Sequence, residues 1–502
     1  MEDRIKLRLS LYGIISAATY IYLILTPNPG ISIPIFILIQ LVSLILIIKN
    51  TEKIKNSKGI MVMVPILIIS LNRFISANNI WRETNFFAIV FLYSAMFLMM
   101  NGNLNLIKIN FNSFLKVIVN IFEPIVNFIV PVKWIAERSK NKEKNLVLKR
   151  VLIGISISIP CVIFLILMLS SADMVFNNNF IAFNNWLADL INIIYIFKLI
   201  IGTFVGLYLF SQLYSVFSDD GNNIVKLTSE SSNSAKQVKG DVIVLNILLV
   251  SILIIYTIFI AIQFKYLFSS GELPYGLNFA EYARRGFFEL VFLSVLNIAL
   301  ILLTTYLLKD KIYVEKNKWA LFTKLMLIYL CILTGILLVS SFYRMSLYDN
   351  AYGFTRLRIL VYMFLIFEAV GLVATLIYIM KHNFNIFAVY TAIGLAFYLT
   401  LNLVKIDDVI AKRNIDMYLA GQTESLDMDY LMTLSADAAP QIMRLLDKNV
   451  EFITRNNARI YLEGKKELYS NMEYNWQSYN LSVERTKSLL EVNKDKLQFK
   501  YN

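Results

Sequence analysis

The strongest constraint on the fold is a series of eleven apolar runs, each long enough to cross the hydrocarbon core of a membrane. Crossing that core takes about 20 apolar residues in a helix. Strands of a membrane barrel alternate apolar and polar residues, whereas these runs are apolar throughout, so helices are predicted. We expect an all-α, polytopic transmembrane bundle with spans near residues 8–25, 31–48, 59–76, 85–100, 150–170, 187–214, 241–264, 286–308, 319–342, 358–380 and 384–402.

The distribution of positive charge indicates an orientation. The formal net charge is +13, although only 17% of residues are charged. Counted alternately from the N-terminus, the odd-numbered extramembrane segments up to the last span hold 24 Lys and Arg residues and the even-numbered ones hold 7. Short cytoplasmic loops carry such an excess, so we predict a cytoplasmic N-terminus. Eleven crossings then place the C-terminal region outside. Because the positive charge lies in short loops between spans, we interpret it as a topology signal rather than as a sign of nucleic-acid binding.

Two segments interrupt the predicted transmembrane domain, residues 1–404. Residues 108–138 are apolar but contain Glu123 and Pro124, which favours an amphipathic segment lying at the membrane interface. Residues 215–240 are rich in Ser, Asn and Lys and are predicted to be a flexible loop between the two halves. The first run follows a basic segment and is interpreted as a retained helix.

Residues 405–502 are predicted to form a C-terminal, all-helical extramembrane domain. This region holds 14 Lys and Arg against 15 Asp and Glu, and its apolar residues have helical spacing. Ser435 or Asp437 can cap a helix whose first turn contains Pro440. Ser482 can cap the final helix.

The unusual polar residues gather in segments predicted to lie on the outer side. One interpretation is an arginine-lined site for an anion or lipid headgroup, and the alternative is interfacial side chains and ion pairs that fix helix ends. Glu281, Arg285 and Glu289 are spaced four residues apart, as in helical ion pairs. The candidate outer-face residues are Asp173, Glu281, Arg284, Arg285, Glu289, Arg344, Asp349, Arg356 and Arg358.

Two charged residues are predicted near mid-membrane depth, Lys198 and Glu368. A charge there is costly and rarely faces lipid. The two side chains either form one static pair or line a polar cavity used for transport. The sequence leaves both alternatives open.

The sequence lacks the motifs of several enzyme classes. A single histidine, His382, is too few for a multi-histidine iron or copper centre. The chain contains neither a phosphate-binding loop of the Gly-x-x-x-x-Gly-Lys type nor a Gly-x-Ser-x-Gly nucleophile motif. We predict no catalytic residue, no cofactor and no metal site.

A set of short motifs resembles a known family. The motifs include Ser171-Ala172-Asp173, Ala351-Tyr352-Gly353, Leu434-Ser435 and Trp476-x-x-Tyr479. In this order they resemble a bacterial multi-pass membrane family known as domain of unknown function four-one-seven-three, related to four-one-five-three. The resemblance runs from about residue 150 to the C-terminus. It implies a protein of the bacterial plasma membrane, without an activity.

Three functions remain as hypotheses. The first is a non-enzymatic sensor, accessory or envelope-associated factor that binds a lipid headgroup or another membrane protein at its outer face. The second is a secondary transporter that uses Lys198 and Glu368. The third is a membrane transferase acting on lipid-linked substrates, which is disfavoured because the first outer loop, residues 26–30, has no carboxylate. The bilayer is the expected partner in each case, and no nucleic acid is expected.

Overall fold

The computed structural model describes residues 3–49, 57–105, 108–138, 168–180, 193–218, 241–263, 287–313, 318–381, 383–471 and 475–497, with positions 154, 158, 162 and 165. Its described residues form helices and connecting turns, with no strand among them. The predicted all-α class is therefore confirmed.

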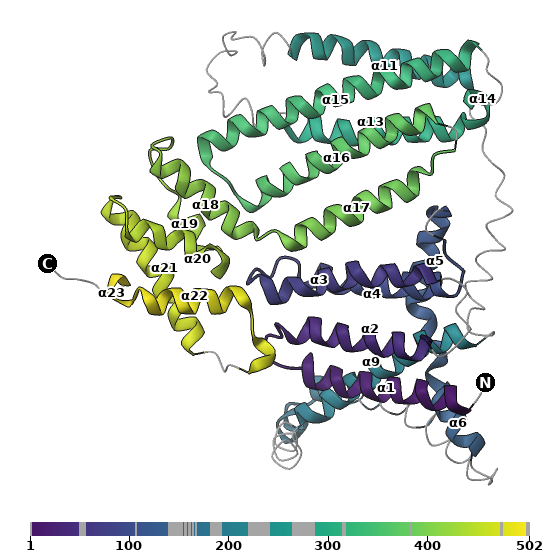
Figure 1. Cartoon of the computed structure of the whole chain (residues 1–502), viewed down its shortest axis with the longest axis vertical. Coiled ribbons are helices and arrows are strands. Elements are labelled where there is room, and N and C mark those ends of the chain that lie inside the picture. Colours follow the sequence, from purple (N-terminus) through teal and green to yellow (C-terminus); the bar gives the residue numbers. More distant parts are fainter. Residues whose placement is uncertain are drawn as a thin grey trace.

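The long helices run alongside one another (Figure 1). Nine helical segments in the described residues are long and apolar enough to cross a membrane, so the chain is a membrane-embedded protein. Eight of them coincide with predicted spans, and the ninth is Phe111–Trp134. The predicted fifth span, 150–170, lies mostly outside the described residues. The long helices are α1 (Asp3–Leu23), α2 (Ser32–Lys49), α3 (Met63–Ile75), α4 (Arg82–Met100), α9 (Ile193–Phe217), α11 (Val242–Gln263), α13 (Phe287–Leu307), α15 (Lys318–Tyr352), α16 (Arg356–Met380) and α17 (Ile386–Leu403).

These helices form two packed groups. In the first, α1, α2, α3, α4 and α9 bury a core that includes Leu9, Phe97 and Phe210. Small residues let α1 and α9 approach closely, because a Cβ added to Gly206 would lie 2.6 Å from the carbonyl oxygen of Gly13. In the second group, α11, α13, α15 and α16 bury a separate core. Helix α17 contacts both α3 and α16 and so joins the two groups.

The segment predicted to lie at the interface is broken into three pieces: α5 (Phe111–Phe122), the 3₁₀ helix η3 (Glu123–Ile129) and α6 (Val130–Arg138). A reciprocal pair of hydrogen bonds between Asn110 and Ser113 caps the start of α5. Helix α5 runs across the direction of α3 and α4 (Figure 1). By length and composition, residues 111–134 could cross a membrane. The direction of α5 fits the predicted position at the membrane interface instead, and that position stays a prediction.

Residues 406–497 form a helical unit with its own core, called here the C-terminal unit. Its core includes Ile410, Leu431, Leu445 and Leu462, all fully buried. The unit lies at one end of the long helices, called here the docked end, and the N-terminus lies at the opposite end (Figure 1). Its helices are α18 (Ile406–Leu419), α19 (Met428–Met432), η5 (Ala436–Ala438), α20 (Ala439–Met443), η6 (Arg444–Leu446), α21 (Phe452–Ser470), η7 (Trp476–Ser478), α22 (Leu481–Val492) and α23 (Lys494–Leu497).

Three shorter elements complete the description. They are η1 (Ser57–Val62), which packs on α3 and α4, α14 (Lys309–Tyr313), which packs on α13 and α15, and the helical residues 174–180 that follow Asp173.

Candidate functional site

The C-terminal unit is joined to the loop between α1 and α2 through backbone hydrogen bonds. The amide of Gly30 donates to the carbonyl of Gln477 at 2.8 Å, and the amide of Ile31 donates to that of Tyr479 at 2.9 Å. A side chain at position 30 would collide with the backbone of Ser478 and Tyr479, since an added Cβ would lie 2.9 Å from the Ser478 carbonyl oxygen. Glycine is therefore required for this approach.

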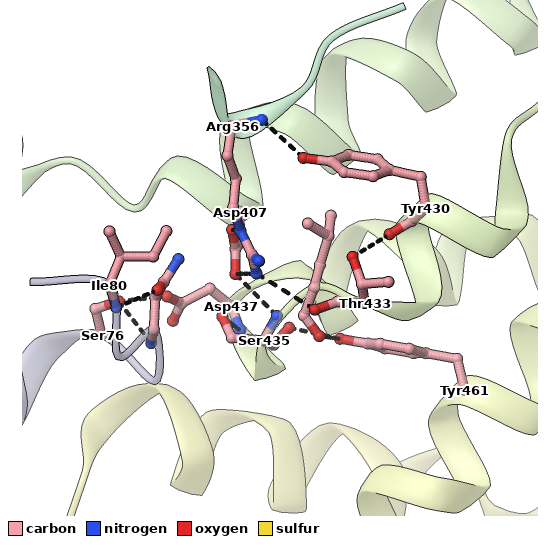
Figure 2. A network of polar contacts seen from close by, with 11 residues as sticks. Ser76, Ile80, Arg356, Asp407, Tyr430, Thr433, Ser435, Asp437 and Tyr461 are labelled. Atoms are coloured by element: carbon pink, nitrogen blue, oxygen red, sulfur yellow. Dashed lines mark hydrogen bonds and ion pairs between the residues drawn. The ribbon is translucent and has the colours of Figure 1, made fainter. Parts of the chain in front are cut away.

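The loop between α3 and α4 is held by two side chains of the C-terminal unit. The Asn480 amide donates to the carbonyls of Arg73 and Ser76, each at 2.8 Å. The buried Asp437 carboxylate accepts a 2.5 Å hydrogen bond from the Ser76 hydroxyl and one of 3.1 Å from the Ala77 amide (Figure 2). Burying this carboxylate without such donors would be costly.

The hydrogen bonds of the C-terminal unit change the capping predictions made for this region. Pro440 lies in the first turn of α20, as the sequence predicts, but the N-cap of α20 is Ala438, without a side-chain hydrogen bond. Ser435 caps the preceding 3₁₀ helix, η5, through its hydroxyl. Asp437 instead bonds the α3–α4 loop, as described above. Ser482 was the wrong residue for the last long helix, because the N-cap of α22 is Asn480, whose side-chain oxygen accepts from the amides of Ser482 and Val483.

Arg356 and Asp407 connect the start of α16 to α18. The guanidinium donates from Nε and Nη2 to the two carboxylate oxygens of Asp407, each at 2.7 Å (Figure 2). Asp407 is fully buried and also accepts from the amide of Ser435 at 2.8 Å. Burial raises the pKa of Asp407, but these hydrogen bonds outweigh burial and hold that pKa below its ordinary value. The pair therefore fixes both Arg356 and the loop that precedes η5.

A cavity of about 540 Å³ lies between the C-terminal unit and the two loops, and is called here the polar cavity. Among the described residues, its lining includes three cationic residues, Arg73, Arg356 and Lys465, and no acidic one. The remaining walls come from Pro27, Asn28, Pro29, Gly30, Ser76, Ala77, Asn78, Asn79, Ile80, Thr433, Leu434, Ser435, Ala436, Leu468, Tyr469, Ser478, Asn480 and Val483.

Arg73 and Lys465 form no ion pair within 4 Å with a carboxylate among the residues described. The Arg73 guanidinium donates to the side-chain oxygen of Asn79. The Lys465 ammonium lies 5.0 Å from the centre of the Tyr461 ring, within cation–π distance. Burial lowers the pKa of Lys465, a shift that Asp407 opposes. Of the three cations that line the cavity, only Arg356 is in direct contact with a carboxylate among the described residues, while Asp407 acts on Lys465 and Glu83 acts on Arg73 at longer range.

Among the described residues, the other candidate outer-face residues do not line this cavity. Arg358 pairs with the buried Asp349 at 3.5 Å and lies 4.2 Å from the centre of the Tyr348 ring. Arg344 is 6% exposed on α15. The contacts of Arg358 fit the interpretation that such charges fix helix ends, here the turn between α15 and α16.

The remaining outer-face candidates are dispersed. Asp173 is exposed, and its carboxylate accepts from the amide of Phe176 at 2.8 Å, so it caps the turn that follows. Glu289 is exposed in the first turn of α13. Glu281, Arg284 and Arg285 lie outside the described residues.

Lys198 and Glu368 lie in different helix groups and form no ion pair. The Lys198 ammonium lies 5.9 Å from the centre of the Tyr195 ring on its own helix, α9. Glu368, on α16, is buried and accepts a 2.7 Å hydrogen bond from the hydroxyl of Ser294 on α13. The structure thus brings Glu368 together with a neutral partner.

Sequence reasoning missed most of the cavity's polar residues. Arg73 lies at the end of a predicted span and reads as an interfacial arginine. Asp407 follows the last span directly, a position that signals an extramembrane role but names no partner. Lys465 is one of many charges on α21, and nothing in its local sequence sets it apart.

The comparisons with known proteins give one match. The family model described as "Domain of unknown function (DUF4153)" matches residues 17–445. No curated protein and no solved structure matches. The match corrects the resemblance noted above, because it names the related family and begins within the first span rather than near residue 150. Since the model covers most of the sequence, the chain belongs to the DUF4153 family of domains of unknown function.

Proposed function

We propose that this membrane protein binds an anionic ligand of the phosphate class in the polar cavity, as a non-enzymatic sensor, accessory or envelope-associated factor. The observation that carries the proposal is the lining of that cavity, which holds Arg73, Arg356 and Lys465 without an acidic residue. A cavity lined by one sign of charge concentrates ions of the other sign.

The hydrogen bonds of Arg356 leave it able to hold a ligand. Its contact with Asp407 uses Nε and Nη2, and Nη2 also donates to the carbonyl of Thr433 at 3.3 Å. The Nη1 group of Arg356 forms no hydrogen bond with the described residues, and the side chain is 30% exposed. Arginine presents donors in a planar fork that suits phosphate oxygens. Asp407 therefore orients Arg356 for an anion.

We further propose that the docked end faces the outside of a bacterial plasma membrane. Loops 26–30 and 77–84, which contact the C-terminal unit, hold one Lys or Arg between them. At the opposite end of the bundle α2 ends at Lys49 and α15 begins at Lys318, positive charges of the kind that a cytoplasmic side carries (Figure 1). This orientation would expose the polar cavity to ligands of the outer leaflet.

The two alternative functions gain less support. A transporter that uses Lys198 and Glu368 together would need them in one cavity, whereas they lie in separate helix groups. A transferase would need an acidic group beside its substrate, and the polar cavity has none in its lining.

Binding of inorganic phosphate to the purified full chain in detergent, measured by isothermal titration calorimetry, tests the proposal. Lys465→Ala should weaken binding roughly tenfold, because a hydrogen bond to a charged group contributes about 1.5–3 kcal/mol. Lys466→Ala is the matched control, since Lys466 is the exposed neighbour of Lys465 on α21 and does not line the cavity. Absence of phosphate binding, or equal losses in the two variants, would overturn the proposal.

A further inference from the structure

A second, larger cavity lies beside the polar cavity among the long helices, and is called here the apolar groove. Its volume is about 1080 Å³. Its lining is dominated by apolar side chains from eight helical elements, including Phe86 of α4, Phe122 of α5 and Phe204 of α9. These three phenylalanines are 57%, 64% and 51% exposed, so the described chain leaves more than half of the surface of each uncovered. The volume is at the upper end of the range of about 300–1,000 Å³ for small-molecule sites.

The apolar groove is continuous with the polar cavity at two residues. Pro29 and Arg73 line both volumes. Among the other polar side chains in the groove, Gln40 accepts from the Ser16 hydroxyl at 2.7 Å and Asn85 donates to Asn402 at 2.7 Å. Arg82 also lines the groove, at the start of α4, and lies 3.6 Å from the carboxylate of Glu83. The positive charge in the two connected cavities therefore lies mainly at the end of the apolar groove that opens into the polar cavity, where Arg73 lines both.

The dimensions of the apolar groove correspond to one leaflet of a bilayer. The groove follows α4 from Arg82 to Tyr93, which at 1.5 Å per residue is about 16 Å of helix. The hydrocarbon core of a bilayer is about 30 Å thick, so this length is about half of it. At its far end the groove meets α5, whose Phe114 and Ile118 line it and which runs across the bundle (Figure 1).

We propose that the ligand is an anionic lipid, with its phosphate-containing headgroup in the polar cavity and one hydrocarbon chain in the apolar groove. The inference rests on the proposed function and names its ligand class. The positive charge of Arg73 favours an anionic headgroup. Because the two cavities are connected, a headgroup in the polar cavity would be separated from α5 by about the thickness of one leaflet. A soluble phosphate would fill the polar cavity alone, whereas a lipid fills both.

Native mass spectrometry of the delipidated full chain, titrated with phosphatidylglycerol, tests this inference. Ala88 lines the groove and not the polar cavity, so Ala88→Trp narrows the groove and leaves the headgroup site intact. We expect Ala88→Trp to weaken phosphatidylglycerol binding roughly tenfold, the effect of excluding about two methylene groups from an apolar site. Binding of inorganic phosphate should be unchanged in the same variant. Val64→Trp is the control, because Val64 is 59% exposed on α3 and lines neither cavity.

The outcomes separate the two proposals. If phosphate binds but Ala88→Trp and Val64→Trp bind phosphatidylglycerol like the unaltered chain, the lipid inference is overturned and the anion site stands. If phosphatidylcholine binds as tightly as phosphatidylglycerol and Arg73→Ala affects neither, the headgroup assignment is overturned. If Ala88→Trp instead abolishes a dimer seen in the mass spectrum, the groove is an interface between two copies and the inference is overturned. Failure of phosphate to bind at all contradicts the proposed function itself.

Discussion

Asp407 is the residue on which the geometry of the polar cavity depends most. It is fully buried, and it holds both the Arg356 guanidinium and the amide of Ser435. Asp437 and Asn480 have the same kind of role at the α3–α4 loop, where each satisfies two groups across the boundary. The polar residues at this boundary therefore position the cavity, and Arg73 and Lys465 remain to contact a ligand.

Replacing Asp407 should destabilise the docked C-terminal unit. Breaking one partner of a buried, hydrogen-bonded ion pair costs roughly 3–5 kcal/mol, so Asp407→Asn should lower the thermal unfolding midpoint clearly. Asp416→Asn is the matched control, because Asp416 also lies on α18 and its ion pair with Arg444 of η6 also spans 2.7 Å, but both side chains are more than a third exposed. Exposed pairs contribute about 0–1 kcal/mol. Equal midpoints for the two variants would contradict the role given to Asp407.

The lowered pKa of Asp407 predicts that its contribution to the stability of the protein depends on pH. The folded-state pKa of Asp407 is lowered, so its contribution to stability is present above the unfolded-state pKa of about 4 and is lost as the pH falls through the folded-state value. The difference in unfolding midpoint between the unaltered chain and Asp407→Asn should therefore shrink below about pH 4. A difference that stays constant from pH 6 to pH 3 would show that Asp407 is not held ionised by its partners.

At the scale of the elements, the sequence predicts the helices well and their junctions poorly. Long apolar runs give eight of the nine candidate spans, because periodicity and length act locally. The bonds that join Gly30 to Gln477 and Ser76 to Asp437 link positions hundreds of residues apart, and no local pattern reports them. Arg356 could be selected from the sequence as a charge at a helix start, but its partner Asp407 could not.

The alternation of the spans yields a topology prediction. Val492 is 84% exposed on the C-terminal unit, and Lys133 is exposed on α6 near the opposite end of the bundle. In a background without native cysteines, Val492→Cys should react with a membrane-impermeant maleimide in intact cells. Lys133→Cys should react only after lysis, because α6 is expected at the cytoplasmic interface. The reverse labelling pattern would invert the orientation and place the polar cavity in the cytoplasm.

On the scale of the whole molecule, the protein combines two packed helix groups with a C-terminal unit that covers one end of the first group. The polar cavity lies where that unit meets the loops after α1 and α3, and the apolar groove lies among α1, α2, α3, α4, α5, η3 and α9, with one side lined by α17. Neither space belongs to a single element, which is why composition and motifs predict a membrane bundle but do not locate its site.

The most direct test of the account is a cryo-electron microscopy map of the full chain in nanodiscs that contain phosphatidylglycerol. We predict headgroup density in the polar cavity between Arg73 and Lys465, continuous with chain density along α4 from Arg82 to Tyr93. A polar cavity without such density, or a groove filled by a helix of a second protein chain, would contradict the central claim that this protein binds an anionic ligand drawn from the bilayer.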